Sequence, residues 1–84
     1  MRRITRASED TKTQIRYAAI EKLTRLNVES GEARMMGQCN EFKIYDSGSY
    51  VKGEGYQVNI ANNHNDYYFI AYIENDTVIL VASS

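Results

Sequence analysis

The sequence contains a single cysteine, Cys39, a single histidine, His64, and neither proline nor tryptophan. One cysteine cannot form a disulfide within the chain, and no cluster of cysteine and histidine residues offers a structural metal site. A domain of 84 residues buries only about 60 to 65% of the surface that its unfolded chain exposes, so its core is marginal. Dimerisation is the remaining support for a small fold, and we expect a homodimer.

Long apolar runs are also missing from the sequence. No segment approaches the roughly 20 consecutive apolar residues that a membrane-spanning helix needs. The first ten residues, MRRITRASED, carry charge but precede no apolar segment, which is not the pattern of a secretory signal. We therefore expect a cytoplasmic protein without membrane association. Hydrophobic residues make up 43% of the chain and charged residues 25%, which is typical of a globular domain.

Charge is distributed unevenly along the chain. Residues 1–26 contain seven Lys and Arg against three acidic residues, whereas residues 27–84 contain three against eight. This asymmetry indicates either a basic surface that contacts phosphate or an acidic partner, or a helix and a sheet that attract each other within the fold.

The amino-terminal third of the chain predicts a helix over residues 8–27, after a basic arm at residues 1–7. Ser8 can cap the first turn, and the acidic residues that follow it favour the positive end of the helix dipole. Gly31 in NVESGE is expected to end the helix. The apolar residues that recur at helical spacing and form one stripe are Ile15, Ala18, Ala19, Leu23 and Leu26.

Residues 32–84 predict strands and turns. We expect a bulge at Gly37, a turn at residues 46–48 (DSG), a strand over residues 50–60 and a polar loop at residues 61–66. The pair Asn75-Asp76 is typical of a two-residue hairpin turn, because both residues tolerate positive φ. The chain is therefore predicted to be one α+β domain, residues 1–84, with the helix packed on one face of an antiparallel sheet of four or five strands.

The hairpin turn also predicts which side chains share a face of the sheet, since opposed residues point the same way. Pairing Ile73 with Val78 and Ile60 with Tyr67 predicts an inner face, covered by the helix, that contains Tyr56, Val58, Phe69, Ala71, Ile73, Val78, Leu80 and Ala82. The opposite, outer face then contains Tyr68, Ile70, Tyr72, Ile79 and Val81, together with Gln57 and Asn59.

The outer face is unusually apolar for one that a helix does not cover. Burying one such side chain contributes roughly 1.5 to 3 kcal/mol, so leaving four or five exposed would forgo an amount comparable with the stability of a small domain. Exposed apolar area with tyrosine is typical of an interface. We expect a partner to bind there, with contributions from the acidic residues Glu54, Asp66, Glu74 and Asp76. The alternative is that the amino-terminal arm or residues 33–45 cover this face.

A nucleic-acid-binding regulator is a second hypothesis. A phosphate-contacting stripe could be formed by Arg2, Arg3, Arg6, Lys12, Arg16 and Arg25, and exposed tyrosines can stack on bases. The sheet that carries those tyrosines is acidic, however, and would repel the phosphate backbone.

No arrangement of residues predicts catalysis, so we expect no enzyme activity, no metal and no cofactor. A thiol nucleophile needs a base, and nothing in the sequence brings Cys39 and His64 together. His64 lies in a polar loop, where a solvated side chain is the simplest interpretation. The glycines of KGEGY, residues 52–56, precede no helix, unlike those of a phosphate-binding loop.

A helix followed by four antiparallel strands resembles the cystatin arrangement. The stretch YQVNIA, residues 56–61, and the following DYYFIAYIE, residues 66–74, are similar to that family's glutamine-valine inhibitory hairpin and its next strand. Ala61 or Asn62 stands where the family has its inhibitory glycine, and the intervening loop is longer. The resemblance is confined to these residues and implies a protease inhibitor.

In its small size, its lack of catalytic motifs and its one apolar surface, the chain also resembles phage-encoded inhibitors of host defence such as anti-CRISPR proteins. This resemblance implies an inhibitor encoded by a phage or mobile element and assigns a role to no residue. The function that we expect is therefore stoichiometric binding, as a small inhibitor or adaptor, to another protein or a ribonucleoprotein.

Overall fold

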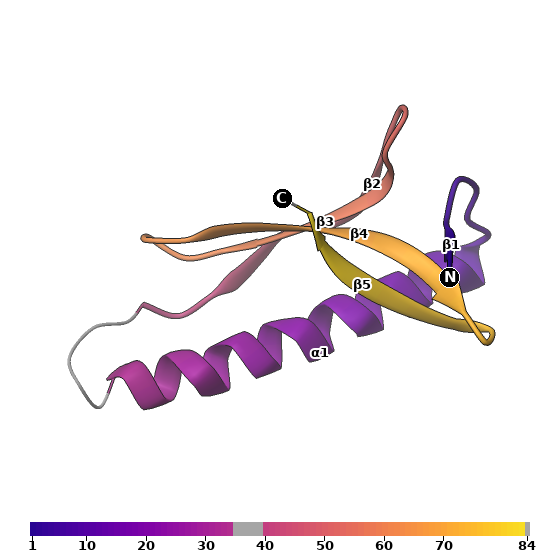
Figure 1. Cartoon of the computed structure of the whole chain (residues 1–84). Helices are drawn as coiled ribbons and strands as arrows, with labels where there is room; N and C mark the ends of the chain where they lie inside the picture. Colours follow the sequence, from indigo (N-terminus) through magenta and orange to yellow (C-terminus); the bar gives the residue numbers. More distant parts are fainter. Residues whose placement is uncertain (35–39, 84) are drawn as a thin grey trace.

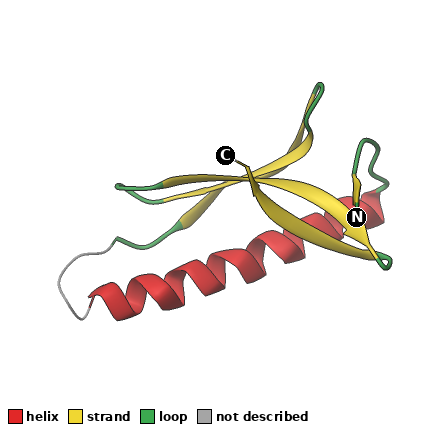
Figure 2. Ribbon diagram, viewed as in Figure 1, coloured by secondary structure: helices red, strands yellow, loops and turns green. Residues whose placement is uncertain are grey.

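The computed structural model describes residues 1–34 and 40–83, and the expected bulge at Gly37 lies outside them, as does Cys39. One helix and five strands are formed by the described residues. In chain order they are β1 (Arg2–Arg3), α1 (Glu9–Arg34), β2 (Lys43–Val51), β3 (Gly55–Ala61), β4 (Asp66–Glu74) and β5 (Thr77–Ser83). The helix lies along one side of a twisted antiparallel sheet (Figures 1 and 2), so the predicted α+β fold is confirmed.

Helix α1 begins as the sequence predicts but ends later. The Ser8 hydroxyl accepts the backbone N–H of Thr11 (3.3 Å), and the Ser8 carbonyl accepts that of Lys12 (2.9 Å). Glu9 and Asp10 lie in the first turn. The helix continues to Arg34, past the end predicted at residue 27, so residues 32–34 are helical and not part of the sheet. A glycine such as Gly31 weakens a helix by only about 1 kcal/mol, which neighbouring helix-forming residues can offset.

The central strand of the sheet is β4. Its residues 68–74 pair with β5 in the predicted register, from Tyr68–Ser83 to Glu74–Thr77. Asn75 and Asp76 form the turn with φ of 50° and 59°, as expected for a two-residue hairpin. On the other edge of β4, residues 66–70 pair with β3, and the predicted pairs Ile60–Tyr67 and Val58–Phe69 are both present. The register of both hairpins is therefore confirmed.

The amino-terminal arm joins the edge of the sheet instead of covering a face. Arg2 pairs with Ile73 and Arg3 with Tyr72, so β1 lies beside β4 just beyond the end of β3. The backbone N–H of Ile4 donates to the carbonyl of Ala71 (3.1 Å), and the Ile4 side chain is buried in the core. The arm was predicted as a separate basic segment, and its role as a fifth strand was not predicted.

The core lies between α1 and the predicted inner face. Ile15 and Ala19 of the helix pack against buried residues of three strands: Val58, Ile60, Phe69, Ala71, Val78 and Leu80. Tyr56 and Ile73 pack partly buried against this core. The Lys22 ammonium lies over the Phe69 ring, 5.3 Å from its centroid. Ala82 was also predicted to face inward but is exposed, because it lies at the end of β5.

Strand β2 differs most from the sequence prediction. The expected turn at residues 46–48 is a bulge within the strand, where the pairing with β3 shifts register on both sides of Asp46. The Asp46 carboxylate stabilises the bulge by accepting the Gly48 N–H (3.0 Å) and the Ser49 hydroxyl (2.7 Å). The actual turn lies at residues 52–54, inside the predicted strand; it contains Gly53 (φ 85°) and is followed by Gly55 (φ 88°).

Asn27 connects the helix to the sheet, and its removal should be costly. Its side-chain amide donates to the Phe42 carbonyl (3.2 Å) and accepts the Phe42 N–H (2.7 Å). We expect Asn27→Ala to lower the free energy of unfolding by about 1 to 3 kcal/mol, since both backbone groups lose their partner in a partly buried site. Urea unfolding followed by circular dichroism measures this loss. Thr24→Ala, which removes an exposed hydroxyl bonded within the helix, is the control and should change stability by less than about 0.5 kcal/mol.

Within the described part of the chain, no helix has the combined length and apolar character that crossing a bilayer requires.

Candidate functional site: the outer face of the sheet

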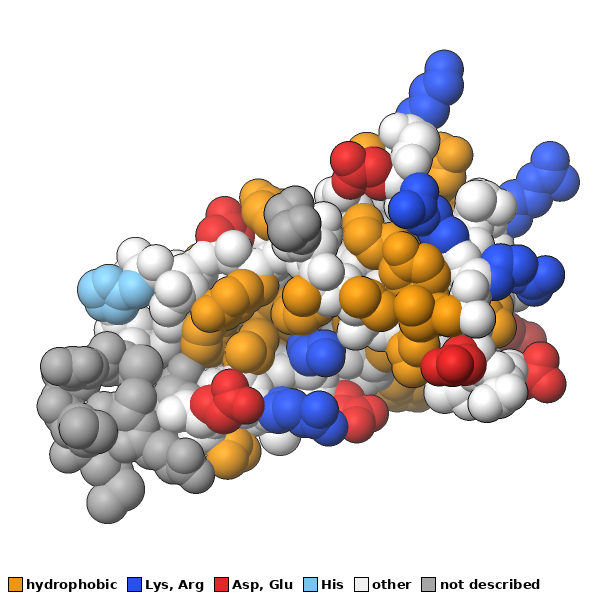
Figure 3. All heavy atoms as spheres, in the orientation of Figure 1, with side chains coloured by type: hydrophobic (Ala, Val, Ile, Leu, Met, Phe, Trp, Pro, Cys, Tyr) orange, Lys and Arg blue, Asp and Glu red, His pale blue; other side chains and the backbone are white. Residues whose placement is uncertain are grey.

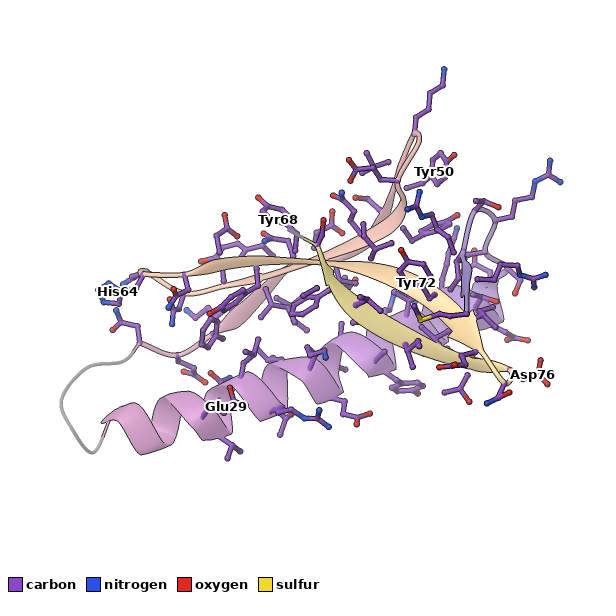
Figure 4. All side chains as sticks on the ribbon, in the orientation of Figure 1. Glu29, Tyr50, His64, Tyr68, Tyr72 and Asp76 are labelled. Carbon is purple, nitrogen blue, oxygen red and sulfur yellow. The ribbon has the colours of Figure 1, made fainter. Side chains whose placement is uncertain are left out.

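The outer face of the sheet is the surface that α1 does not cover. Strand pairing arranges its side chains in three rows across the strands. The first row is Arg3, Tyr72 and Ile79, the second is Gln57, Ile70 and Val81, and the third is Asn59, Tyr68 and Ser83. The seven predicted residues Gln57, Asn59, Tyr68, Ile70, Tyr72, Ile79 and Val81 therefore share one face. Tyr68 and Tyr72 are labelled along β4 in Figure 4.

Accessibility differs strongly among the apolar residues of this face. Tyr68 is 45% exposed and Val81 37%, whereas Tyr72 and Ile79 are half-buried. Ile70 is only 7% exposed, which corrects the expectation that it offers contact area to a partner. Ile70 occupies the middle of the three rows, where its neighbours on adjacent strands shield it. A partner would therefore contact the tyrosines and Val81, with Ile70 supporting them from below.

A hollow of about 320 Å³ lies over the middle of the outer face. Its lining consists of Arg3, Gly53, Glu54, Ile70, Tyr72, Val81, Ala82 and Ser83. The turn between β2 and β3 rises beside it, at the top of Figure 1. The Arg3 guanidinium donates to the Gly53 carbonyl (2.9 Å), and the Gln57 amide donates to the Glu54 carboxylate. The Arg3 bond connects the amino-terminal arm to the turn, and the Gln57 bond connects the turn to β3, so together they fix the wall of the hollow.

The end of the outer face near the loop at residues 62–65 is polar. The Asn59 amide donates to the Asp66 carboxylate (2.6 Å) and to the Tyr67 carbonyl (3.1 Å). The Tyr68 hydroxyl donates to the other carboxylate oxygen of Asp66 (3.4 Å). This arrangement holds the exposed Tyr68 ring in a defined orientation while leaving its sides accessible.

Two of the predicted partner-binding acids lie apart from the hollow. Glu74 pairs with Thr77 next to the β4–β5 turn, and Asp76 is in that turn. Figure 4 shows Asp76 at the tip of this hairpin, far from the labelled Tyr68. Glu54 and Asp66 are the acids that border the apolar part of the face.

The predicted basic residues do not form one stripe. Arg3 lines the hollow and also a second depression, which it shares with Arg2, Arg6 and Ile73. On the helix, Lys12 lies 3.5 Å from Glu9 and Arg25 3.8 Å from Glu21. Arg16 and Arg25 are separated by about two and a half helical turns, so they lie on opposite sides of α1.

Sequence reasoning missed a second apolar stripe on α1. Tyr17, Ile20 and Val28 are all exposed, and their spacing of three and eight residues places them on the side opposite Ile15 and Ala19. The same spacing rule that identified the core stripe would have found this one. Tyr45 and Tyr50 on the edge strand β2 are also exposed, and the Tyr50 ring packs against Tyr56 with centroids 5.5 Å apart.

The described residues contain no group of three or more His, Cys, Asp and Glu side chains that could hold a metal ion. His64 is exposed, and its backbone N–H donates to the Asn62 side chain (2.9 Å) within the β3–β4 loop. It is labelled at the tip of that hairpin in Figure 4.

No family model matches this chain, and neither does any curated protein or solved structure. The stretch that resembles the cystatin hairpin, residues 56–61, lies within β3, and its Val58 is fully buried between the sheet and α1. Val58 is therefore not accessible for insertion into a protease.

Proposed function

We propose that this chain is a small, non-enzymatic cytoplasmic protein that binds one macromolecular partner stoichiometrically, as an inhibitor or adaptor. The partner is a protein or a ribonucleoprotein, and it contacts the outer face around Tyr68, Tyr72 and Val81. An inhibitor of the anti-CRISPR type, encoded by a phage or mobile element, is one form that this function would take.

The exposed tyrosine and valine on a sheet face without a covering helix carry this proposal. Tyr68 and Val81 are both more than one-third exposed. Val81 lines the hollow over Ile70, and Tyr68 lies in the neighbouring row of the same face. Tyrosine is enriched among the residues that dominate binding energy, especially where polar groups surround it. Here Asn59, Gln57 and Glu54 supply those polar groups, so the face combines an apolar centre with a polar rim.

The charge of the face favours a protein surface over a phosphate backbone. The Glu54 carboxylate borders the hollow, the Asp66 carboxylate lies at the end of the face beside Asn59 and Tyr68, and the guanidinium of Arg3 is already bonded to the Gly53 carbonyl. A partner with basic side chains around an apolar centre would complement this arrangement, and such complementarity speeds association and selects partners.

Tyr72→Glu is expected to weaken partner binding by at least about 30-fold, because it places a charge in the apolar centre of the interface. The partner is first captured from a lysate of the native host and identified by mass spectrometry. It is then purified and titrated against each variant by calorimetry, which gives the molar ratio as well as the affinity. Because Tyr72 is half-buried, Tyr68→Ala provides a second test at an exposed position, with an expected loss of about tenfold or more.

Tyr17→Glu is the matched control, since Tyr17 is an exposed tyrosine on α1, which packs on the inner face of the sheet and not on the outer face. It should bind the partner as the wild type does. Equal affinity of all three variants would disprove the outer face as the binding site. A different result would favour nucleic acid: binding to random RNA or DNA that falls steeply between about 50 and 200 mM salt and is lost in Arg2→Ala/Arg3→Ala.

A further inference from the structure

Strand β5 forms an unprotected edge of the sheet, since among the described strands it pairs with β4 alone. Its sequence, TVILVAS, contains no charged residue, proline or glycine, and its pairing with β4 has no register shift. Figure 1 shows β5 in front of the helix, and hydrophobic side chains gather over this region in Figure 3. A regular, uncharged edge of this kind is a template for pairing with another strand.

The free backbone groups of this edge belong to Val78, Leu80 and Ala82. Leu80 lies opposite Ala71, and the Ala71 carbonyl accepts the N–H of Ile4 from the other side of β4 (3.1 Å). Ala71 therefore points its backbone groups away from β5, and Leu80 points its own away from β4, as in the widely spaced pairs of an antiparallel ladder. The same alternation turns the N–H and C=O groups of residues 78 and 82 outward.

The opposite edge of the sheet, β2, is built differently. Its ladder is interrupted by register shifts around Asp46, and it carries a second charge at Lys43. Bulges and charged side chains are the features by which proteins prevent an edge strand from pairing with another chain. Strand β5 has neither feature, so it is the edge available for intermolecular pairing.

We propose that a second copy of this chain pairs with β5 in antiparallel orientation, about a two-fold axis at Leu80. In this register Leu80 lies opposite Leu80 of the second copy, and Val78 lies opposite its Ala82. Every outward N–H and C=O group of these three residues then has a partner, and the two sheets become one. Two copies of this edge can pair with each other because Val78 and Ala82, whose backbone groups point outward, lie at equal distances on either side of Leu80.

The outer-face side chains of β5 fit the same occupant. Ile79 and Val81 point to the outer face, next to Tyr72 and Ile70 respectively. In the proposed register, Ile79 of one copy lies opposite Val81 of the other. Pairs of β-branched side chains on neighbouring strands stabilise a sheet, so Val81, which is exposed in the single chain, gains a neighbour beside it while its outward surface stays open to the partner.

Light scattering coupled to size-exclusion chromatography tests the pairing. We expect the wild type to show twice the chain mass at high concentration. Ala82→Pro removes an outward N–H without breaking the ladder to β4 and should raise the dimer dissociation constant by about tenfold or more. Val81→Lys should act in the same way, whereas Val28→Lys, at an exposed valine on the helix, should leave the dimer unchanged.

Disulfide cross-linking tests the register. In a Cys39→Ser background, a mixture of Ile79→Cys and Val81→Cys proteins should cross-link more efficiently than either protein alone, since position 79 faces position 81 across the axis. A wild type that is monomeric up to about 1 mM, the range of weak association, overturns the proposal. So does a dimer that Ala82→Pro and Val81→Lys leave intact, or preferential cross-linking of one protein with itself. Tyr68→Ala, which should weaken partner binding, should leave the dimer intact. The proposed dimer and the proposed function can therefore be disproved separately.

Discussion

Ile15→Ala is expected to lower the free energy of unfolding by about 2 to 5 kcal/mol, a large part of the stability of a domain this small. Ile15 is only 1% exposed and lies at the centre of the contact between α1 and the sheet. Its Cγ2 atom approaches the bulge in β2 so closely that a Cβ atom added to Gly48 would lie 3.0 Å away. The surrounding backbone therefore has little freedom to close the cavity that alanine leaves.

Ile20→Ala is the matched control for this prediction. Ile20 lies on the same helix but is 52% exposed, so the same chemical change should alter the stability by only about 0.5 kcal/mol. Urea unfolding of both variants, followed by circular dichroism, measures the difference. Equal losses in the two variants would contradict the observed orientation of α1, because that orientation alone distinguishes the two isoleucines.

The hairpin between β4 and β5 could be predicted in full because its determinants are local. Asn75 and Asp76 accept the positive φ values of a two-residue turn, and the turn then determines every pair along both strands. The alternation of side chains placed Phe69 and Ala71 on the inner face and Tyr68 and Tyr72 on the outer face, as observed. The turn residues Asn75 and Asp76, together with the alternation of side chains along each strand, were therefore sufficient to predict the register and the faces of this hairpin.

Strand β2 could not be predicted correctly because two local signals competed. Both DSG at residues 46–48 and KGEG at residues 52–55 can form a turn, and nothing nearby in the sequence decides between them. The choice is made by distant groups: Ile15 of the helix packs against Gly48, and the arm packs against Gly55. The late end of α1 has a similar cause, since Asn27 bonds to Phe42, well outside the helix.

The sequence predicted which residues belong to the candidate site, but not how exposed they are or that a hollow lies between them. Alternation placed seven residues on the outer face, yet the burial of Ile70 and the hollow above it depend on the β2–β3 turn and on Arg3. Arg3 was assigned to a phosphate-contacting stripe, whereas it pairs with Tyr72 and bonds to Gly53. A strand of two residues has no periodicity, so β1 left no pattern in the sequence.

Gly55→Ala should be the substitution that most directly separates the arm from the sheet. A Cβ atom at this position would lie 2.8 Å from the Ile4 carbonyl oxygen and 3.0 Å from the Arg3 Cγ atom. The carbonyl is backbone and cannot move without displacing β1 or the turn. We expect a loss of about 2 to 5 kcal/mol in unfolding free energy, combining the strain of a positive φ with this collision. Faster hydrogen exchange of the Ile4 amide, which bonds to Ala71, should accompany it.

Gly53→Ala isolates the effect of the collision. Gly53 has nearly the same φ, 85° against 88° for Gly55, but a Cβ atom there would have no neighbour within 4 Å. Its cost should therefore be the backbone strain alone, about 1 to 3 kcal/mol, and the Ile4 amide should stay protected. If both variants lose the same stability and neither exposes that amide, the arm does not contact Gly55. The wall of the hollow would then lack the support that Arg3 gives it, because Arg3 reaches Gly53 only when β1 is paired with β4.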